Sequence, residues 1–114
     1  MIERSLRRSS LFAVTAAVSL FIALPAAAQV DEDAAKLLFK QNECGKCHNP
    51  DKAKKGPSLK KIAKDNKGDE KKLIQHLTVS KKVKLDDGSE EDHKVVDSKD
   101  PKAIGNLAKW ILSH

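Results

Sequence analysis

The sequence predicts a small all-α domain behind an N-terminal export signal. Four segments place their apolar residues at helical spacing, and a residue suited to capping a helix stands at the start of each. The stretch of 20 residues between the third and the fourth segment shows little periodicity. The 86 residues that follow the signal are enough for one domain at most.

The first 28 residues have the organisation of a secretory signal peptide. Arg4, Arg7 and Arg8 precede an uncharged apolar run at 11–24, which ends at a proline and three alanines. This run has 14 residues, fewer than the roughly 20 that cross a bilayer, so a permanent membrane anchor is the weaker interpretation. We therefore expect cleavage after residue 28, a mature domain at 29–114 without a membrane span, and a periplasmic location.

The mature domain is too polar to build an ordinary core. Of its 86 residues, 27 are apolar and 34 are charged, and its aromatic residues are Phe39 and Trp110. A chain so short gains little from burial and generally needs a disulfide, a metal or a large cofactor to stabilise it. The composition excludes a multidomain enzyme and a self-sufficient apolar core.

The first three predicted helices lie between residues 31 and 78. The first spans 31–42, with acidic residues suited to its N-terminus. Its apolar residues at helical spacing are Ala34, Ala35, Leu37, Leu38 and Phe39. Ser58 can cap a short second helix that ends near 66–68, and Asp69 can cap a third, which carries Leu73, Ile74 and Leu77 on one face.

The second half of the mature domain combines a loop with the clearest helix. Residues 79–98 hold an Asp86-Asp87-Gly88 turn signal, so we expect a long irregular loop with at most a small hairpin. Asp100 can cap the last helix, and Pro101 suits its first position. Its apolar residues repeat at helical spacing: Ile104, Leu107, Ala108, Ile111 and Leu112.

Both cysteines of the chain fall in one motif, Cys44-Gly45-Lys46-Cys47-His48. A disulfide across two intervening residues closes a tiny loop and stabilises little. A redox dithiol usually follows a strand, and no strand is predicted before Cys44. A zinc site needs two further ligands at close spacing, whereas His76 and His93 are isolated in the sequence. The remaining interpretation is covalent attachment of a haem.

The spacing of this motif suits haem chemistry. Two thioethers, from Cys44 and Cys47, would fix one edge of the ring to the chain. His48 would then be held next to the iron, where a neutral imidazole is a good axial ligand. A bound haem would also fill the core that the composition leaves thin.

Further residues outside the motif carry a family resemblance. Leu38-Phe39 shortly before the first cysteine, Gly56-Pro57 followed by Leu59, and the ending at 107–112 span essentially the whole mature chain. Together with the motif they resemble the small bacterial class I cytochromes c. The resemblance implies the class I cytochrome c fold, with three to five helices wrapped around one covalently attached haem c and its iron.

The resemblance also implies specific contacts. The first and last helices should cross near Phe39 and Trp110. The backbone carbonyl of Pro57 should accept a hydrogen bond from the ring N–H of His48, which would orient this proximal ligand.

The chain departs from the family at the second axial ligand. Most relatives use a methionine on the loop before the last helix, whereas the methionine here is Met1, which leaves with the signal. His93 lies in the corresponding loop, and we expect it to bind the iron opposite His48. The alternatives are His76, His114, a lysine or no protein ligand, with His93 then a solvated residue beside acidic neighbours.

The other two histidines have separate expected roles. His114 is the last residue and should be exposed to solvent. His76 lies beside the apolar face of the third helix, where relatives often place a basic side chain near a haem propionate, and we prefer that role to ligation. A pair of imidazole ligands should favour the ferric state and a moderately low to low potential, because methionine is the ligand that raises it.

The resemblance implies a monomeric one-electron carrier rather than an enzyme. Lysines near the haem edge would steer docking onto acidic redox partners: Lys46, Lys52, Lys54, Lys55, Lys81, Lys82 and Lys84. Nucleic acid is not an expected partner, since the mature domain carries 19 lysines against 15 acidic residues and is exported. The alternatives are a haem protein whose open or displaceable sixth site binds a small gas or anion, and an electron-donating subunit of a separate oxidoreductase.

Overall fold

The computed structural model describes residues 16–20 and 29–114. Apart from 16–20, the predicted signal peptide lies outside the described residues. Within those ranges, no helix combines the length and the apolar character that crossing a membrane requires.

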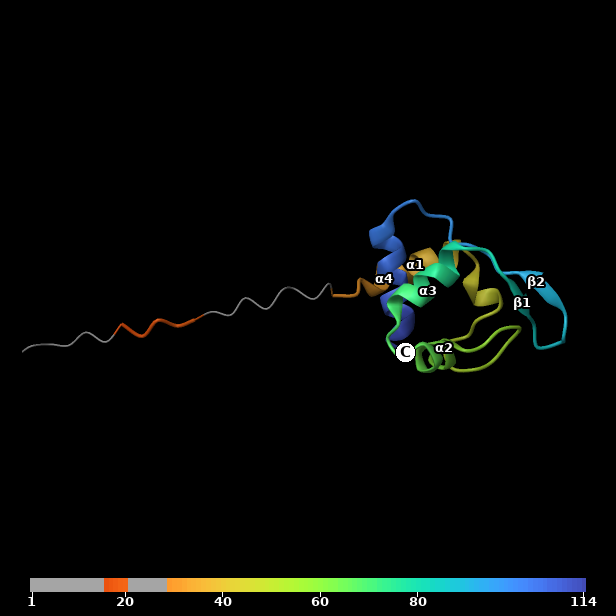
Figure 1. The fold of residues 1–114 in the computed structure, drawn as a ribbon, viewed down its shortest axis with the longest axis horizontal. Helices are drawn as coiled ribbons and strands as arrows, with labels where there is room; N and C mark the ends of the chain where they lie inside the picture. The colour runs from red at the N-terminus through yellow and green to blue at the C-terminus, as the bar shows by residue number, and fades with distance from the viewer. Residues whose placement is uncertain (1–15, 21–28) are drawn as a thin grey trace, which may run out of the picture.

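Residues 29–114 form a mostly helical domain with one small hairpin (Figure 1). The elements are α1 (Glu32–Gln41), the 3-10 turn η1 (Cys44–Lys46), α2 (Leu59–Asn66), α3 (Glu70–Thr78), β1 (Lys82–Lys84), β2 (Glu90–Asp92) and α4 (Pro101–Leu112). This order confirms the four predicted helices, and the segment expected to be an irregular loop with at most a small hairpin does contain a hairpin of two three-residue strands.

Three of these helices begin at the caps that the sequence predicts, and the first begins at one of the acidic residues expected at its N-terminus. A capping side chain accepts a backbone N–H from the first turn in every case: Asp31 from Ala34, Ser58 from Lys61, Asp69 from Lys72, and Asp100 from Lys102. These bonds satisfy N–H groups that a helix leaves without intrahelical partners. Local sequence therefore fixes where each helix starts.

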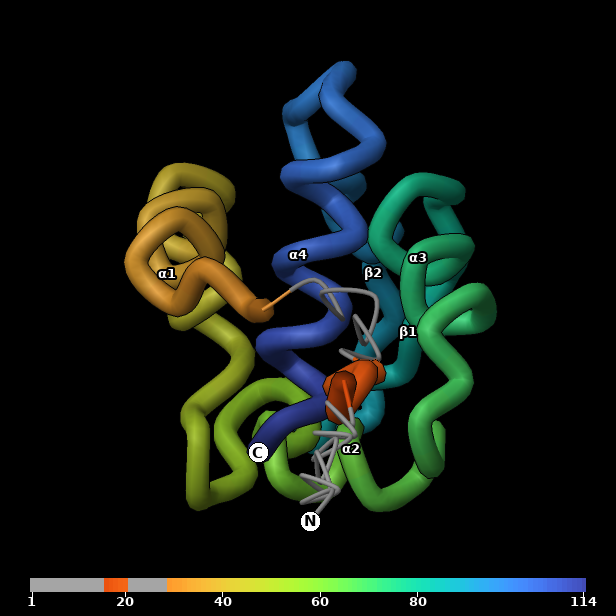
Figure 2. The backbone as a smooth tube through the Cα atoms, turned by 90° about the vertical axis from the view of Figure 1, so that its left-hand side faces the viewer, coloured from red at the N-terminus to blue at the C-terminus, as the bar shows by residue number. Residues whose placement is uncertain are grey.

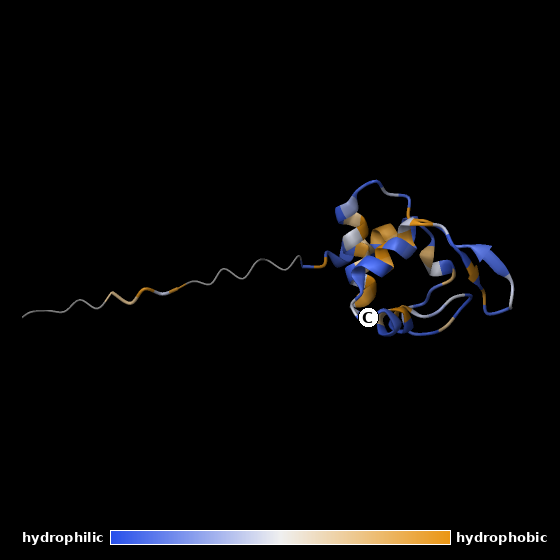
Figure 3. Ribbon diagram, in the orientation of Figure 1, coloured by the Kyte–Doolittle hydropathy of each residue, from blue (hydrophilic) through white to orange (hydrophobic). Residues whose placement is uncertain are grey.

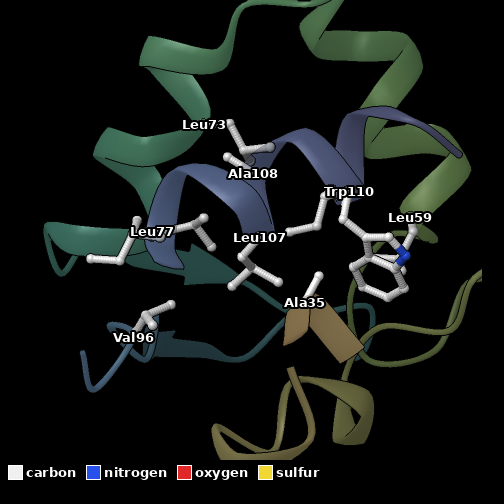
Figure 4. Packing of buried hydrophobic residues seen from close by; sticks show 10 residues of the cluster. Ala35, Leu59, Leu73, Leu77, Val96, Leu107, Ala108 and Trp110 are labelled. Atoms are coloured by element: carbon white, nitrogen blue, oxygen red, sulfur yellow. The ribbon is translucent and has the colours of Figure 1, made fainter. Parts of the chain in front are cut away.

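The core lies around α4, which packs against α1, α2 and α3. Figure 2 shows α4 between α1 and α3, with α2 near its C-terminal end. Leu107 and Ala108 of α4 and Ala35 of α1 are fully buried, and Figure 4 shows Ala35 facing Leu107. In Figure 3 the hydrophobic residues gather where the helices meet, while the hairpin is largely hydrophilic.

The first and last helices are joined by an aromatic contact and by a pair of hydrogen bonds. The rings of Phe39 and Trp110 pack edge to face, with their centres 5.4 Å apart, in the geometry that aromatic pairs favour. Asn106 accepts the N–H of Asp31 and donates to its carbonyl, both at 2.8 Å. The predicted crossing near Phe39 and Trp110 is thus confirmed.

The hairpin returns the chain to the end of α3. Its antiparallel strands pair Lys82 with Asp92, and its turn contains Gly88 at φ 86°, a backbone conformation that favours glycine. Beyond β2, the N–H of His93 donates to the carbonyl of Lys81 at 2.7 Å, and Val96 N–H donates to Leu77 at 2.8 Å. These bonds place His93 close to α3.

Candidate functional site

A cavity of about 580 Å³ brings the predicted site residues together. Residues of α1, η1, α2, α3, the hairpin and α4 line it, including Cys44, Cys47, His48, His76 and His93. Pockets for cofactor-sized groups range over roughly 300–1,000 Å³ and are mostly apolar. The cavity therefore has the size and the lining that a haem requires.

The two cysteine thiols lie half-buried at η1 and are not bonded to each other. Burial is the main cause that raises the pKa of Cys44. A reactive redox dithiol needs a thiol whose pKa is lowered, so this environment does not suit that chemistry. No group of three or more His, Cys, Asp or Glu side chains in the described ranges could hold a bare metal ion. The thiols instead face a cavity at a spacing suited to thioether attachment.

The turn that carries the thiols also directs His48 into the cavity wall. The N–H groups of Cys47 and His48 both donate to the carbonyl of Cys44, at 3.2 and 3.0 Å. Glu43 enters the turn with φ 56°, in the left-handed region. Because the turn is tight, both thiols and the imidazole of His48 come from one short segment.

A hydrogen bond fixes the ring of His48. Its Nδ1 lies 2.7 Å from the carbonyl oxygen of Pro57, the contact that the family resemblance implies. A carbonyl only accepts, so Nδ1 carries a proton, and this bond selects the tautomer whose lone pair is on Nε2. This tautomer leaves Nε2 available to a metal.

Gly56 makes room for this arrangement. A Cβ at this position would lie 2.9 Å from Cε1 and 3.2 Å from Nδ1 of His48. The N–H of Gly56 also donates to the carbonyl of Cys47 at 2.9 Å, so its backbone is held against the motif. The sequence shows the Gly56-Pro57 pair, but only the fold shows that the glycine touches the ring.

His93 lies opposite His48 at a separation that suits a shared metal. Their ring centres are 6.1 Å apart, with the planes inclined by 50°. Imidazole binds a metal ion such as zinc at about 2 Å, and the ring centre lies about 1 Å behind that nitrogen, so two rings around one metal stand about 6 Å apart. The structure thus brings together the two residues predicted to hold the iron.

The surroundings of His93 favour a neutral ring. Burial lowers its pKa most, and the neighbouring His76 and His48 lower it further, while the backbone of Lys94 acts in the opposite direction. Its Nδ1 is buried and has no hydrogen-bond partner among the described residues. A neutral imidazole is the form that binds metals, so His93 fits the haem as a ligand.

His76 packs against His93. The two ring centres are 4.2 Å apart and the planes are inclined by 44°. Burial, then Lys81 and His48, lower the pKa of His76. The side chain is therefore a half-buried imidazole packed against His93, in surroundings that favour its neutral form.

His114 lies away from the cavity. The residue is exposed, its ring packs edge to face on Trp110 at 4.7 Å between centres, and its Nδ1 is 3.0 Å from the Trp110 carbonyl oxygen. It is not among the residues that line the cavity. The geometry brings His48, His76 and His93 together and leaves His114 apart.

The hairpin contributes apolar side chains that sequence reasoning missed. Val83 and Leu85 are half-buried and line the cavity, although their neighbours Lys82 and Lys84 are exposed. The alternation of charged and apolar residues over 82–85 was the available signal, because a half-buried strand has this period. The segment predicted as a loop is thus part of the cavity wall.

Exposed charges surround the mouth of the cavity. Five exposed lysines line it without an ion-pair partner in the described part of the chain: Lys55, Lys72, Lys81, Lys84 and Lys94. We call these five residues the rim lysines. Lys46 also lines the cavity but pairs with Glu43 at 2.9 Å, and Lys54 donates to the carbonyl of Gly45. Of the lysines predicted for docking, Lys55, Lys81 and Lys84 belong to the rim.

Comparisons with known proteins identify a family and a similar solved structure. A family model described as cytochrome c matches residues 32–114. The crystal structure of the class 1 cytochrome MtoD from Sideroxydans lithotrophicus ES-1 is similar, with 52% sequence identity and a TM-score of 0.70. The match covers 74% of this chain and 96% of that one. A search of curated proteins found no significant match.

Proposed function

The chain belongs to the cytochrome c family, and from this premise we propose that it is an exported one-electron carrier whose haem iron is held by His48 and His93. The family binds haem c covalently, and Cys44 and Cys47 form the attachment motif. The haem supplies the redox centre when bound. The residues around it determine its ligands, its exposure and its approach to partners.

The distance between His48 and His93 carries this proposal. Their ring centres lie 6.1 Å apart across the cavity. His48 is held by Pro57, and His93 is anchored at its backbone by the carbonyl of Lys81. Two ligands held from independent segments need to move little when the charge of the site changes by one electron. Two imidazoles also favour the oxidised state, since methionine is the axial ligand that raises the potential.

The other residues of the cavity fit a carrier rather than a catalyst. Cys44 and Cys47 anchor the cofactor, and Pro57 sets the tautomer and plane of the His48 ring. We assign no residue the transfer of protons to a substrate. Electron transfer through an exposed edge needs a docking surface, and we propose that the rim lysines provide it for acidic redox partners in the periplasm.

Electron paramagnetic resonance of the ferric protein at low temperature tests the ligand pair. We expect a low-spin wild-type spectrum typical of two nitrogen ligands, and a changed spectrum in His93→Ala, because the variant lacks the distal imidazole. His114→Ala serves as the matched control, since His114 is remote from the cavity. A His93→Ala spectrum identical to that of the wild type would contradict the assignment.

A further inference from the structure

We infer that His76 is a second distal imidazole, able to bind the iron at the sixth position when His93 leaves it. This inference rests on the proposed function, because it takes His93 as the resident ligand. It starts from the juxtaposition of two imidazoles, His76 and His93, on one wall of the cavity, with the proximal His48 facing them.

The position of His76 follows from the packing of α3. Leu73 and Leu77, one turn before and one residue after His76, are buried with 3% and 6% of their surface exposed. They fix the helix against α4. His76 itself is half-buried, and its ring centre lies 4.2 Å from that of His93. A rigid helix therefore holds this imidazole against the proposed distal ligand.

The ring of His76 is held in place by packing rather than by a polar partner. No hydrogen bond or ion pair to another described residue restrains it, and Lys81 is the charged lysine that acts on it electrostatically. By contrast, Pro57 restrains the ring of His48. Rotation about the two side-chain torsions of a histidine moves the ring by several ångströms, so His76 can enter the space that His93 leaves.

The exchange requires no redox partner and no added proton. The bond from the iron to the His93 nitrogen breaks and a bond to a His76 nitrogen forms, with the oxidation state unchanged. An imidazole binds a metal in its neutral form, so the net charge at the iron is the same with either ligand. His76 would thus keep the iron six-coordinate and compete with small molecules for the sixth position.

Three variants of the haem-loaded protein test this inference: His93→Ala, His76→Ala and the double variant. In the ferric state we expect His93→Ala to remain low-spin with a spectrum shifted from that of the wild type, because His76 replaces the lost ligand. His76→Ala should stay low-spin, since His93 remains. The double variant should lose the low-spin signal and become high-spin.

Binding of external imidazole provides a second readout. In His93→Ala the added imidazole has to displace His76, whereas in the double variant the position is open. We therefore expect the double variant to bind external imidazole at least about tenfold more tightly than His93→Ala. Far-UV circular dichroism of each variant establishes that it is folded, and His93→Gln and His76→Gln repeat the series with side chains closer in size.

The outcomes separate this inference from the proposed function. A high-spin His93→Ala protein that binds imidazole as tightly as the double variant would overturn the role of His76 and leave His93 as the ligand. A wild-type spectrum in His93→Ala, together with a high-spin His76→Ala protein, would make His76 the resident ligand and overturn both.

Discussion

At the scale of single residues, the position of the His48 ring depends on the absence of a side chain at Gly56. Its α-carbon faces the His48 ring, and the nearest ring atom would stand only 2.9 Å from an added Cβ. His48 cannot retreat easily, because Pro57 holds its Nδ1. The missing side chain of Gly56 is therefore a requirement for seating the proximal ligand.

Substituting Gly56→Ala should displace His48 and destabilise the haem-loaded protein. Overpacking a tight contact costs about 1–3 kcal/mol, so we expect a lower urea midpoint of unfolding and a shifted ferric spectrum. Gly45→Ala is the matched control within the motif, because its Cβ would lie 3.5 Å from Phe39, an ordinary contact. Equal midpoints for the two variants would contradict this role of Gly56.

At the scale of elements, two asparagines connect α1 with the C-terminal third of the chain. Asn42, with 4% of its surface exposed, donates from Nδ2 to the Leu38 carbonyl and accepts the N–H of Asp97 at 2.8 Å. Asn106 makes the pair of bonds to Asp31 in a more exposed place. Each asparagine makes two side-chain hydrogen bonds, so the two residues differ mainly in how deeply they are buried.

We expect Asn42→Ala to destabilise the protein more than Asn106→Ala. The first change leaves the N–H of Asp97 without its partner in a part-buried position, which costs about 1–3 kcal/mol, whereas water can replace the bonds of Asn106 at a net cost of about 0.5–1.5 kcal/mol. Urea unfolding of the two haem-loaded variants and of the wild type measures the loss in the free energy of unfolding for each substitution. Equal losses would show that burial does not decide the contribution of these bonds.

The hairpin and α3 act together as elements of the cavity wall. β1 and β2 are only three residues long each, and a two-stranded hairpin is marginal by itself. The bond between His93 and Lys81 closes the base of the hairpin, and the bond from the N–H of Val96 to the carbonyl of Leu77 connects the chain beyond it to α3. The hairpin thereby carries His93 to the same wall as His76.

For the whole molecule, the distribution of charge around the cavity determines which partners approach. The rim lysines are exposed, and within the described part of the chain none of them forms an ion pair. The acidic residues on the same lining include Glu91 and Asp92, so the rim is predominantly but not uniformly positive. Such a field attracts anions over a distance that salt limits to about 10 Å at 0.1 M ionic strength.

Reversing two rim charges should change the rate with small oxidants according to their charge. For Lys55→Glu with Lys81→Glu, we expect oxidation of the reduced protein by anionic hexacyanoferrate(III) to slow by roughly tenfold at low salt. Oxidation by cationic hexaammineruthenium(III) should become faster, and high salt should remove both effects. Stopped-flow absorbance measures the rates. Lys99→Glu with Lys102→Glu reverses two exposed lysines outside the cavity lining and is the control for net charge; a similar slowing there would contradict a local role of the rim.

The amino-acid sequence by itself determined the local features of this protein. The four caps, the helical spacing and the turn at Gly88 depend on residues within one or two turns of each other, and all agree with the structure. The attachment motif is equally local, since both thiols and His48 lie within five residues. The predicted loss of Met1 with the signal leaves the mature sequence without methionine, and this absence predicts His93 as the second axial ligand.

The tertiary structure decided what depends on distances between remote segments. The contact of His76 with His93 joins residues from α3 and from the chain beyond the hairpin, and the bond from Asp97 to Asn42 spans 55 residues. Spacing along the chain indicates which face of a helix is apolar. It does not indicate which aromatic or imidazole rings from remote segments come into contact. Burial, which lowers the pKa of His76 and His93, likewise arises only when these segments pack together.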